Sequence, residues 1–122
     1  MFKILIIDDS VLMRNHSRSA LEAEGFTVDD LLPGSVEELR ERLEANPPDL
    51  VLSDFNMPIL DGLAVARAIR HANPRIPVVI LSSNRDAARD AHLKAVGVRL
   101  ILHKPIRPSD LVDAVVKVLA AS

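Results

Sequence analysis

The sequence lacks cysteine, tryptophan and tyrosine, and its three phenylalanines leave an aromatic content of 2% in 122 residues. Without cysteine, the chain can form no disulfide, no thiolate nucleophile and no cysteine-ligated metal site. So few aromatic rings argue against stacking on nucleic-acid bases and against an aromatic belt at a membrane surface. The formal net charge of -2 provides no basic footprint for nucleic acid. We therefore expect no direct nucleic-acid partner.

Long apolar segments are also missing. The longest runs, residues 4–7 and 78–81, have the length of strands and are far too short to span a membrane. The N-terminal residues lead directly into Asp8 and Asp9, which is not the pattern of a signal peptide. With 48% hydrophobic and 26% charged residues, the composition is typical of a soluble domain that buries a core. We expect one cytoplasmic domain over residues 1–122, without a membrane segment.

Five β-rich runs alternate with five segments of helical pattern. The expected strands cover residues 2–7, 26–32, 50–53, 76–81 and 99–102. Such alternation predicts βαβ units, which build a parallel sheet covered by helices on both faces. Asp29 and Asp30 interrupt the second run and indicate a strand at the edge of the sheet. The predicted fold class is therefore α/β, a doubly wound sheet of five parallel strands flanked by five helices.

The predicted helices carry recognisable signals at their ends. Ser10 is placed to cap the first helix, which should end near Gly25. Ser35 and Glu38 have the spacing of a capping box at the start of the second helix. The fourth helix should cover residues 86–96. The last helix has the clearest apolar stripe, formed by Leu111, Val112, Val115, Val116 and Leu119.

Polar residues follow four of the five strands at the point where each strand ends. They are Asp8 and Asp9 after the first, Asp54 after the third, Ser82 after the fourth and Lys104 after the fifth. Because the carboxyl ends of parallel strands meet at one edge of the sheet, these side chains should converge. Three carboxylates about 5 Å apart repel one another by about 3 kcal/mol per pair at an effective dielectric near 20. Such a cluster calls for a cation, and oxygen ligands favour Mg²⁺ over Zn²⁺.

A site of this composition suits phosphoryl chemistry, since Mg²⁺ prefers one or two carboxylates together with phosphate oxygens. Lys104 would place a second positive charge on a phosphoryl group, and Ser82 would donate a hydrogen bond to it. Each residue taken alone also fits a structural role, with Asp8 and Asp9 at the start of a helix and the others in turns or caps. Their joint position at strand ends favours a functional site.

Short motifs occur in a fixed order along nearly the whole chain. They are Asp8-Asp9-Ser10 with Arg14, Asp54 followed by Met57-Pro58 and Asp61-Gly62, then Ser82, and finally Lys104-Pro105. Together they resemble the receiver domain of two-component response regulators, the CheY-like family. The resemblance implies a flavodoxin-like sheet in the strand order 2-1-3-4-5. It also implies that a sensor histidine kinase or a histidine phosphotransfer protein phosphorylates Asp54, in a reaction that needs Mg²⁺ as cofactor.

The resemblance further implies a metal site. Asp9 and Asp54 would bind Mg²⁺ directly, together with the backbone carbonyl of Asn56. Asp8 would act mostly through a coordinated water.

By the same resemblance, Lys104 and Ser82 would hold the phosphoryl oxygens, and the Lys104–Pro105 peptide bond is expected to be cis. The family usually has Tyr or Phe three residues before this lysine, whereas the present chain has Ile101. The familiar switch joins a movement of the hydroxyl residue, here Ser82, to an inward flip of the aromatic ring. Ile101 cannot make that flip. The departure concerns how the signal is transmitted and not the phosphorylation chemistry.

The family's usual output face, formed by the fourth helix, the fifth strand and the fifth helix, is expected to bind a downstream protein. The residues that make this face mildly basic, suiting an acidic partner or a plain solvated surface, are Arg89, His92, Lys94 and Arg99. His103 should point away from Lys104, and all four histidines are expected on solvated surface. Since the chain stops just after the last helix, no output domain is expected. Whether it is a natural single-domain regulator or a receiver cut from a longer protein stays open.

Three other functions fit parts of the sequence. A pseudo-receiver would keep the fold without phosphorylation; Ile101 is compatible with it, but the complete acidic set argues against it. A phosphatase with an aspartyl-phosphate intermediate needs an acid/base Asp two residues after the nucleophile, and Asp8-Asp9-Ser10 does not provide that spacing. Flavin binding is disfavoured because the acidic first loop would repel the cofactor's phosphate. We expect a signalling phosphoacceptor that catalyses its own phosphorylation and slow autodephosphorylation, and not an enzyme with an external substrate.

Overall fold

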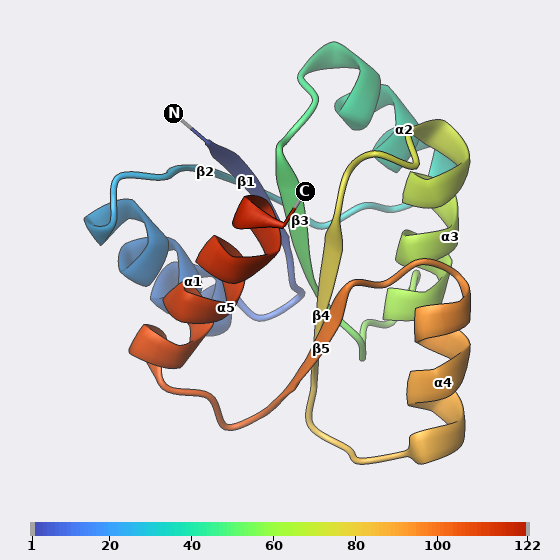
Figure 1. Ribbon diagram of the computed structural model, residues 1–122. Helices are drawn as coiled ribbons and strands as arrows, with labels where there is room; N and C mark the ends of the chain where they lie inside the picture. Colours follow the sequence, from blue (N-terminus) through green and yellow to red (C-terminus); the bar gives the residue numbers. More distant parts are fainter. Residues whose placement is uncertain (1, 122) are drawn as a thin grey trace.

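Strands and helices alternate strictly along the chain, and the computed structural model describes residues 2–121 (Figure 1). The strands are β1 (Lys3–Ile7), β2 (Thr27–Leu31), β3 (Leu50–Asp54), β4 (Val78–Ser82) and β5 (Leu100–His103). The helices are α1 (Val11–Ala23), α2 (Val36–Ala45), α3 (Gly62–Ala72), α4 (Ala87–Ala95) and α5 (Pro108–Ala120). Within the described residues, no helix combines the length and the apolar character that crossing a membrane requires.

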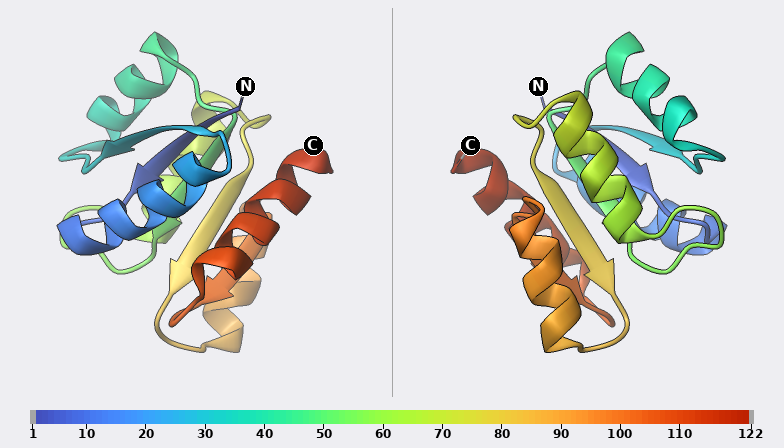
Figure 2. Two further views of the ribbon diagram at one scale, coloured as in Figure 1. Left: turned by 90° about the vertical axis from the view of Figure 1, so that its left-hand side faces the viewer. Right: turned by 90° about the vertical axis from the view of Figure 1, so that its right-hand side faces the viewer.

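The strands form one parallel sheet in the order β2-β1-β3-β4-β5. This order confirms the predicted doubly wound, flavodoxin-like fold and places β2 at an edge. Helices α1 and α5 cover one face of the sheet, and α2, α3 and α4 cover the other (Figures 1 and 2). All strands run in the same direction, so the loops that follow β4 and β5 lie at the same end of the sheet (Figure 1).

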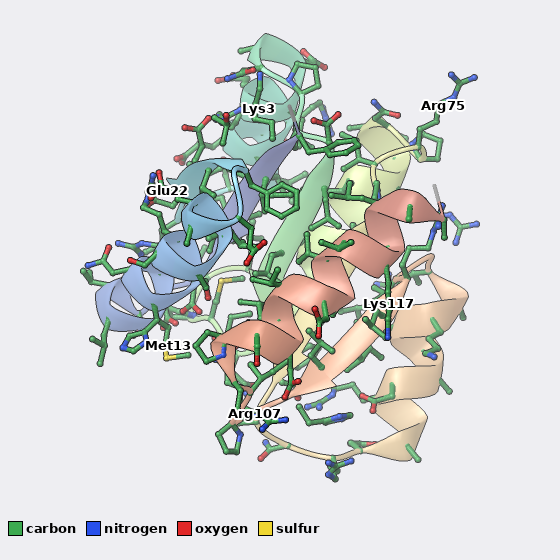
Figure 3. The ribbon with its side chains drawn as sticks, turned by 60° about the vertical axis from the view of Figure 1, so that its left-hand side comes forward. Lys3, Met13, Glu22, Arg75, Arg107 and Lys117 are labelled. Carbon is green, nitrogen blue, oxygen red and sulfur yellow. The ribbon has the colours of Figure 1, made fainter. Side chains whose placement is uncertain are left out.

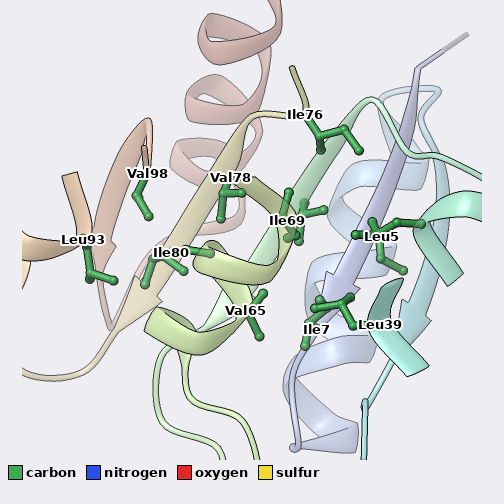
Figure 4. Packing of buried hydrophobic residues seen from close by; sticks show 13 residues of the cluster. Leu5, Ile7, Leu39, Val65, Ile69, Ile76, Val78, Ile80, Leu93 and Val98 are labelled. Atoms are coloured by element: carbon green, nitrogen blue, oxygen red, sulfur yellow. The ribbon is translucent and has the colours of Figure 1, made fainter. Parts of the chain in front are cut away.

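Each face of the sheet has its own apolar core. Leu5 and Ile7 of β1 point toward α3 and α2, whereas Ile4 and Ile6 of the same strand face α1 and α5. This alternation follows from the period of two residues in a strand. Figure 4 shows the first core, where Ile80 of β4 lies beside the α3 side chains. Truncating a fully buried Leu or Ile in such a core to Ala costs about 2–5 kcal/mol.

The helix starts confirm the predicted caps and revise one detail. Ser10 Oγ accepts a hydrogen bond from the Met13 N–H at 3.3 Å, and Ser35 Oγ accepts one from the Glu38 N–H at 3.1 Å. The carboxylate of Glu38 does not complete a reciprocal capping box. It accepts instead from the N–H of Gly34, at 2.9 Å. The Glu38 side chain therefore binds the backbone N–H one residue before the one that a capping box predicts.

The predicted stripe of α5 was wrong at one position. Val116 is 47% exposed. The buried positions of this helix are Leu111, Val112, Ala114, Val115 and Val118. With about 100° per residue, position 116 lies roughly 140° around the helix from position 111. It therefore falls outside the arc that faces the sheet.

Charged side chains occupy the periphery, as Figure 3 shows for Glu22, Arg75 and Lys117. Two carboxylates of the edge strand β2 form ion pairs with helices on opposite faces. Arg42 Nη2 of α2 lies 2.8 Å from Asp29 Oδ2, and Arg18 Nη2 of α1 lies 2.5 Å from Asp30 Oδ2. These pairs hold the edge strand between the two helix layers.

Candidate functional site

Three carboxylates converge at the carboxyl end of the sheet. Asp8 and Asp9 follow β1, and Asp54 is the last residue of β3, the strand paired with β1. Each contributes one oxygen to a set of atoms that all lie within 4.8 Å of one another. Asp8 is only 3% exposed and Asp54 only 6%, whereas Asp9 is exposed. The predicted convergence of these strand ends is confirmed.

The buried carboxyl group of Asp8 shows the electrostatic cost of this cluster. Burial, the largest effect, raises its pKa above the ordinary value of 3.8, and the charges of Asp54 and Asp9 raise it further. The Ser10 N–H, which donates a 2.9 Å hydrogen bond to Asp8 Oδ1, and the positive charge of Lys104 lower the pKa in part. Ionisation of Asp8 is therefore disfavoured unless a cation compensates the negative charge around it.

Lys104 brings a positive charge to the cluster from the end of β5. Its Nζ donates a hydrogen bond to Asp54 Oδ1 at 2.9 Å. Its backbone N–H donates to the carbonyl of Ser82 at 2.7 Å, which fixes the lysine against the end of β4. The Lys104–Pro105 peptide bond is cis, as expected.

Ser82 ends β4 and is completely buried. Its hydroxyl donates to the carbonyl of Asn84 at 2.9 Å and accepts a 3.3 Å hydrogen bond from the Asn84 N–H. The same oxygen accepts a hydrogen bond from Arg89 Nη2 at 2.5 Å. The hydroxyl is thus held at the end of the sheet, next to β5, which Lys104 follows.

Arg89 was expected on the output surface, and this prediction was wrong. Its side chain is 17% exposed, and its guanidinium carbon lies 4.3 Å from the ring centre of Phe55, the residue after Asp54. Side chains of a helix tilt toward its N-terminus, so a long side chain in the first turn of α4 can reach the strand ends. Asp86 caps α4 by accepting a hydrogen bond from the Arg89 N–H at 3.0 Å. An N-cap residue three positions before Arg89 is the sequence signal that places this arginine in the first turn of the helix.

Ile101 and His103 of β5 lie on the α4 side of the sheet. Ile101 packs against the core beneath α3 and α4, as an aliphatic side chain in the place of the family's aromatic ring. His103 points away from Lys104, as expected, but it is partly buried and not solvated. Its Nε2 lies 3.3 Å from Asp90 Oδ2 of α4.

The three carboxylates fit a Mg²⁺ ion. All three donors are oxygen atoms, which hard cations prefer, and their mutual separations allow a common ligand. Burial, and to a smaller extent the charges of Asp54 and Asp9, raise the pKa of Asp8, and a bound cation would favour its ionised form. The side chain of Asn56 is exposed and donates to Ser83 Oγ at 3.4 Å. That its backbone carbonyl completes the metal site stays a prediction.

A family model described as the response regulator receiver domain matches residues 4–116. The chain belongs to this family. Protein-glutamate methylesterase/protein-glutamine glutaminase 3 of Rhodospirillum rubrum is 36% identical to the receiver over 107 residues, which are 86% of this chain and 28% of the relative. The receiver spans half or less of the length of several curated relatives that it matches.

Other similar proteins have the length of a receiver domain. The response regulator receiver protein CpdR of Brucella abortus is 32% identical over 130 aligned positions that cover all of both chains. The solved structure of chemotaxis protein CheY4 of Vibrio cholerae superimposes with a TM-score of 0.88 at 28% identity. The superposition covers 97% of this chain and 98% of that one. Family and fold agree with the resemblance seen in the sequence motifs.

Proposed function

We propose that residues 1–122 form one receiver domain that accepts a phosphoryl group on Asp54. The donor is the phosphohistidine of a sensor histidine kinase or of a histidine phosphotransfer protein. The observation that carries this proposal is the position of the Asp54 carboxylate, which lies within the acidic cluster and only 2.9 Å from the Lys104 ammonium. A carboxylate placed between a metal site and a cation is suited to attack phosphorus.

In the proposed reaction, a carboxylate oxygen of Asp54 forms a bond to phosphorus while the bond from phosphorus to the donor's imidazole nitrogen breaks. The electron pair of that bond stays on the imidazole nitrogen. Lys104 and the Ser82 hydroxyl hold oxygens of the transferred group and stabilise its charge, which is the main requirement of phosphoryl transfer. Lys104 Nζ already contacts Asp54, and Ser82 is the last residue of β4, the strand next to β3.

Asp8, Asp9 and Asp54, with the backbone carbonyl of Asn56, would hold Mg²⁺. When bound, the ion neutralises carboxylate charge and polarises the phosphoryl group. Asp8 would act mostly through a coordinated water, and Asp9 and Asp54 would be direct ligands. The protein acts as a signalling phosphoacceptor, with slow autodephosphorylation returning it to the resting state.

We further infer that the receiver works in the cytoplasm, where it binds a histidine kinase or phosphotransfer protein and a downstream protein. The downstream partner would bind the face formed by α4, β5 and α5. Ile101 lies beneath this face, so its aliphatic side chain replaces the usual aromatic element of the switch. Neither a membrane nor nucleic acid is a direct partner in this proposal.

The test is the intact mass of the chain after incubation with acetyl phosphate, with and without Mg²⁺. One phosphoryl group on the wild type, absent in Asp54→Ala and absent without Mg²⁺, is the expected result. Asp113→Asn is the matched control, because this exposed carboxylate of α5 lies outside the cluster. A chain that binds Mg²⁺ but acquires neither the phosphoryl group nor a stable phosphoryl analogue would be a pseudo-receiver.

A further inference from the structure

The guanidinium of Arg89 enters the phosphorylation site from α4. Its Nη2 donates to Ser82 Oγ at 2.5 Å and to the carbonyl oxygen of Asn84 at 2.6 Å. The planar group lies over the ring of Phe55, 4.3 Å from its centre, which holds it in this orientation. The long side chain of Arg89 is therefore ordered toward the site and is not part of a solvated basic surface.

The hydroxyl proton of Ser82 is already used in a hydrogen bond. A serine hydroxyl carries a single proton. In the structure this proton is directed to the carbonyl of Asn84, 2.9 Å away. The hydroxyl can therefore donate to a phosphoryl oxygen only if it gives up that carbonyl. Asn84 lies in the exposed β4–α4 loop, so its carbonyl would then need a donor from water or from another side chain.

Arg89 supplies the replacement donor in advance, because its Nη2 already donates to the Asn84 carbonyl. When the Ser82 proton turns away, the carbonyl keeps a charged hydrogen-bond partner. The second bond from Arg89, to the Ser82 oxygen itself, polarises the hydroxyl and makes its proton a better donor.

We propose that Arg89 is a positioning residue that makes the Ser82 hydroxyl proton available to the phosphoryl group on Asp54. This inference rests on the proposed function of Asp54. It adds a residue from α4 to a site otherwise built from the ends of strands. Arg89 acts through Ser82, and no contact of its own with the phosphoryl group is required.

The surroundings of Arg89 join the same network to β5. Among the described residues, the buried atoms Arg89 Nε and Asp90 Oδ1 have no hydrogen-bond partner, and they face each other across 3.8 Å. Asp90 Oδ2 lies 3.3 Å from His103, the residue of β5 that pairs with Ser82 in the sheet. A series of polar contacts thus connects Ser82, through Arg89 and Asp90 of α4, to His103 of β5. It lies on the same side of the sheet as the aliphatic side chain of Ile101.

A double-mutant cycle tests the proposal. The measured quantity is the affinity for beryllofluoride, a stable phosphoryl analogue, at saturating Mg²⁺, by calorimetry on the wild type, Arg89→Gln, Ser82→Ala and the double variant. Arg89→Gln should weaken binding about five- to tenfold, the scale of one ordinary hydrogen bond, because Arg89 acts only indirectly through Ser82. In the Ser82→Ala background, the same replacement should change the affinity less than twofold, because no hydroxyl proton remains to be released.

Two further readouts separate positioning from charge and from misfolding. Arg85→Gln removes the same charge from an exposed arginine of the β4–α4 loop whose side chain has no hydrogen bond or ion pair within residues 2–121, and it should change the affinity less than twofold. The affinity of Arg89→Gln for Mg²⁺ alone should be unchanged or higher, because a cation near the acidic cluster has been removed. A damaged site would bind Mg²⁺ more weakly.

Several results would overturn the role of Arg89. They are an unchanged beryllofluoride affinity in Arg89→Gln, an equal loss in the Ser82→Ala background, an equal loss in Arg85→Gln, and a parallel loss of Mg²⁺ affinity. The proposed function fails separately, if the wild type binds no beryllofluoride or if Asp54→Ala binds it as well as the wild type does. In that case the inference about Arg89 falls with it.

Discussion

Replacing Asp8 by Asn should stabilise the metal-free protein. Asp8 is 3% exposed, and one of its oxygens lies within 4.8 Å of oxygens from both Asp9 and Asp54. One such pair of charges repels by about 3 kcal/mol at an effective dielectric near 20. Solvent around exposed Asp9, the positive charge of Lys104 and the hydrogen bond from Ser10 offset most of this. The net gain expected for Asp8→Asn at pH 7 is about 1 kcal/mol, since Asn keeps the acceptor oxygen.

The gain should depend on pH in a definite direction. The pKa of Asp8 in the folded chain is raised above the ordinary value of 3.8 that applies when the chain is unfolded. Below that value the carboxyl group is protonated in both states, so the wild type and Asp8→Asn should be equally stable. As the pH rises through the folded pKa, the wild type loses stability because the buried group must ionise. The advantage of Asp8→Asn therefore grows with pH and is complete once the pH lies above the folded pKa.

Thermal unfolding followed by far-ultraviolet circular dichroism measures this effect. In EDTA at pH 7, Asp8→Asn should melt about 3–5 °C above the wild type, the shift that about 1 kcal/mol produces in a chain of this size. The control is Asp113→Asn, an exposed carboxylate of α5. With millimolar Mg²⁺, the wild type should gain more stability than Asp8→Asn does, because binding to the folded state stabilises it. A lower melting temperature for Asp8→Asn in EDTA would refute the electrostatic argument.

Two other predictions concern Lys104 and the β3–α3 loop. Lys104→Met keeps the aliphatic stem but removes the ammonium that lies 2.9 Å from Asp54; it should tighten Mg²⁺ binding severalfold and slow phosphorylation by acetyl phosphate about a hundredfold. Weaker Mg²⁺ binding would contradict this. Gly62→Ala should cost about 1–3 kcal/mol in urea unfolding, because its Cβ would lie 2.9 Å from the backbone Cα of Phe55. A change below about 0.5 kcal/mol would show that the loop yields without strain.

The sequence predicted the fold because its signals are local and repeated. Continuous apolar runs between helical segments specify a parallel sheet whatever the tertiary details are. The acidic cluster followed from topology alone, since parallel strands bring Asp8, Asp9 and Asp54 to one edge. The ammonium of Lys104 was predicted in the same way and lies where expected.

The details that the sequence did not reveal depend on the direction of single side chains. Val116 is apolar, but it faces solvent because of the way α5 is rotated about its own axis relative to the sheet. Glu38 has two backbone N–H groups within reach, and the path of the preceding turn selects Gly34. Arg89 resembles any surface arginine in a helix pattern. Its guanidinium contacts both Ser82 and the ring of Phe55, a residue more than thirty positions earlier in the chain, and no local pattern reveals that proximity.

The two ion pairs on β2 bear on how the molecule behaves in crowded solution. An edge strand offers an unsatisfied row of backbone N–H and C=O groups to any strand that approaches it. On β2, Asp29 and Asp30 carry charge beside that row, and arginines anchored in α1 and α2 hold one carboxylate on each face. A second copy that added its β2 in register would bring like carboxylates together on both faces. The edge strand therefore opposes growth of the sheet from one molecule to the next, and with it the formation of fibres.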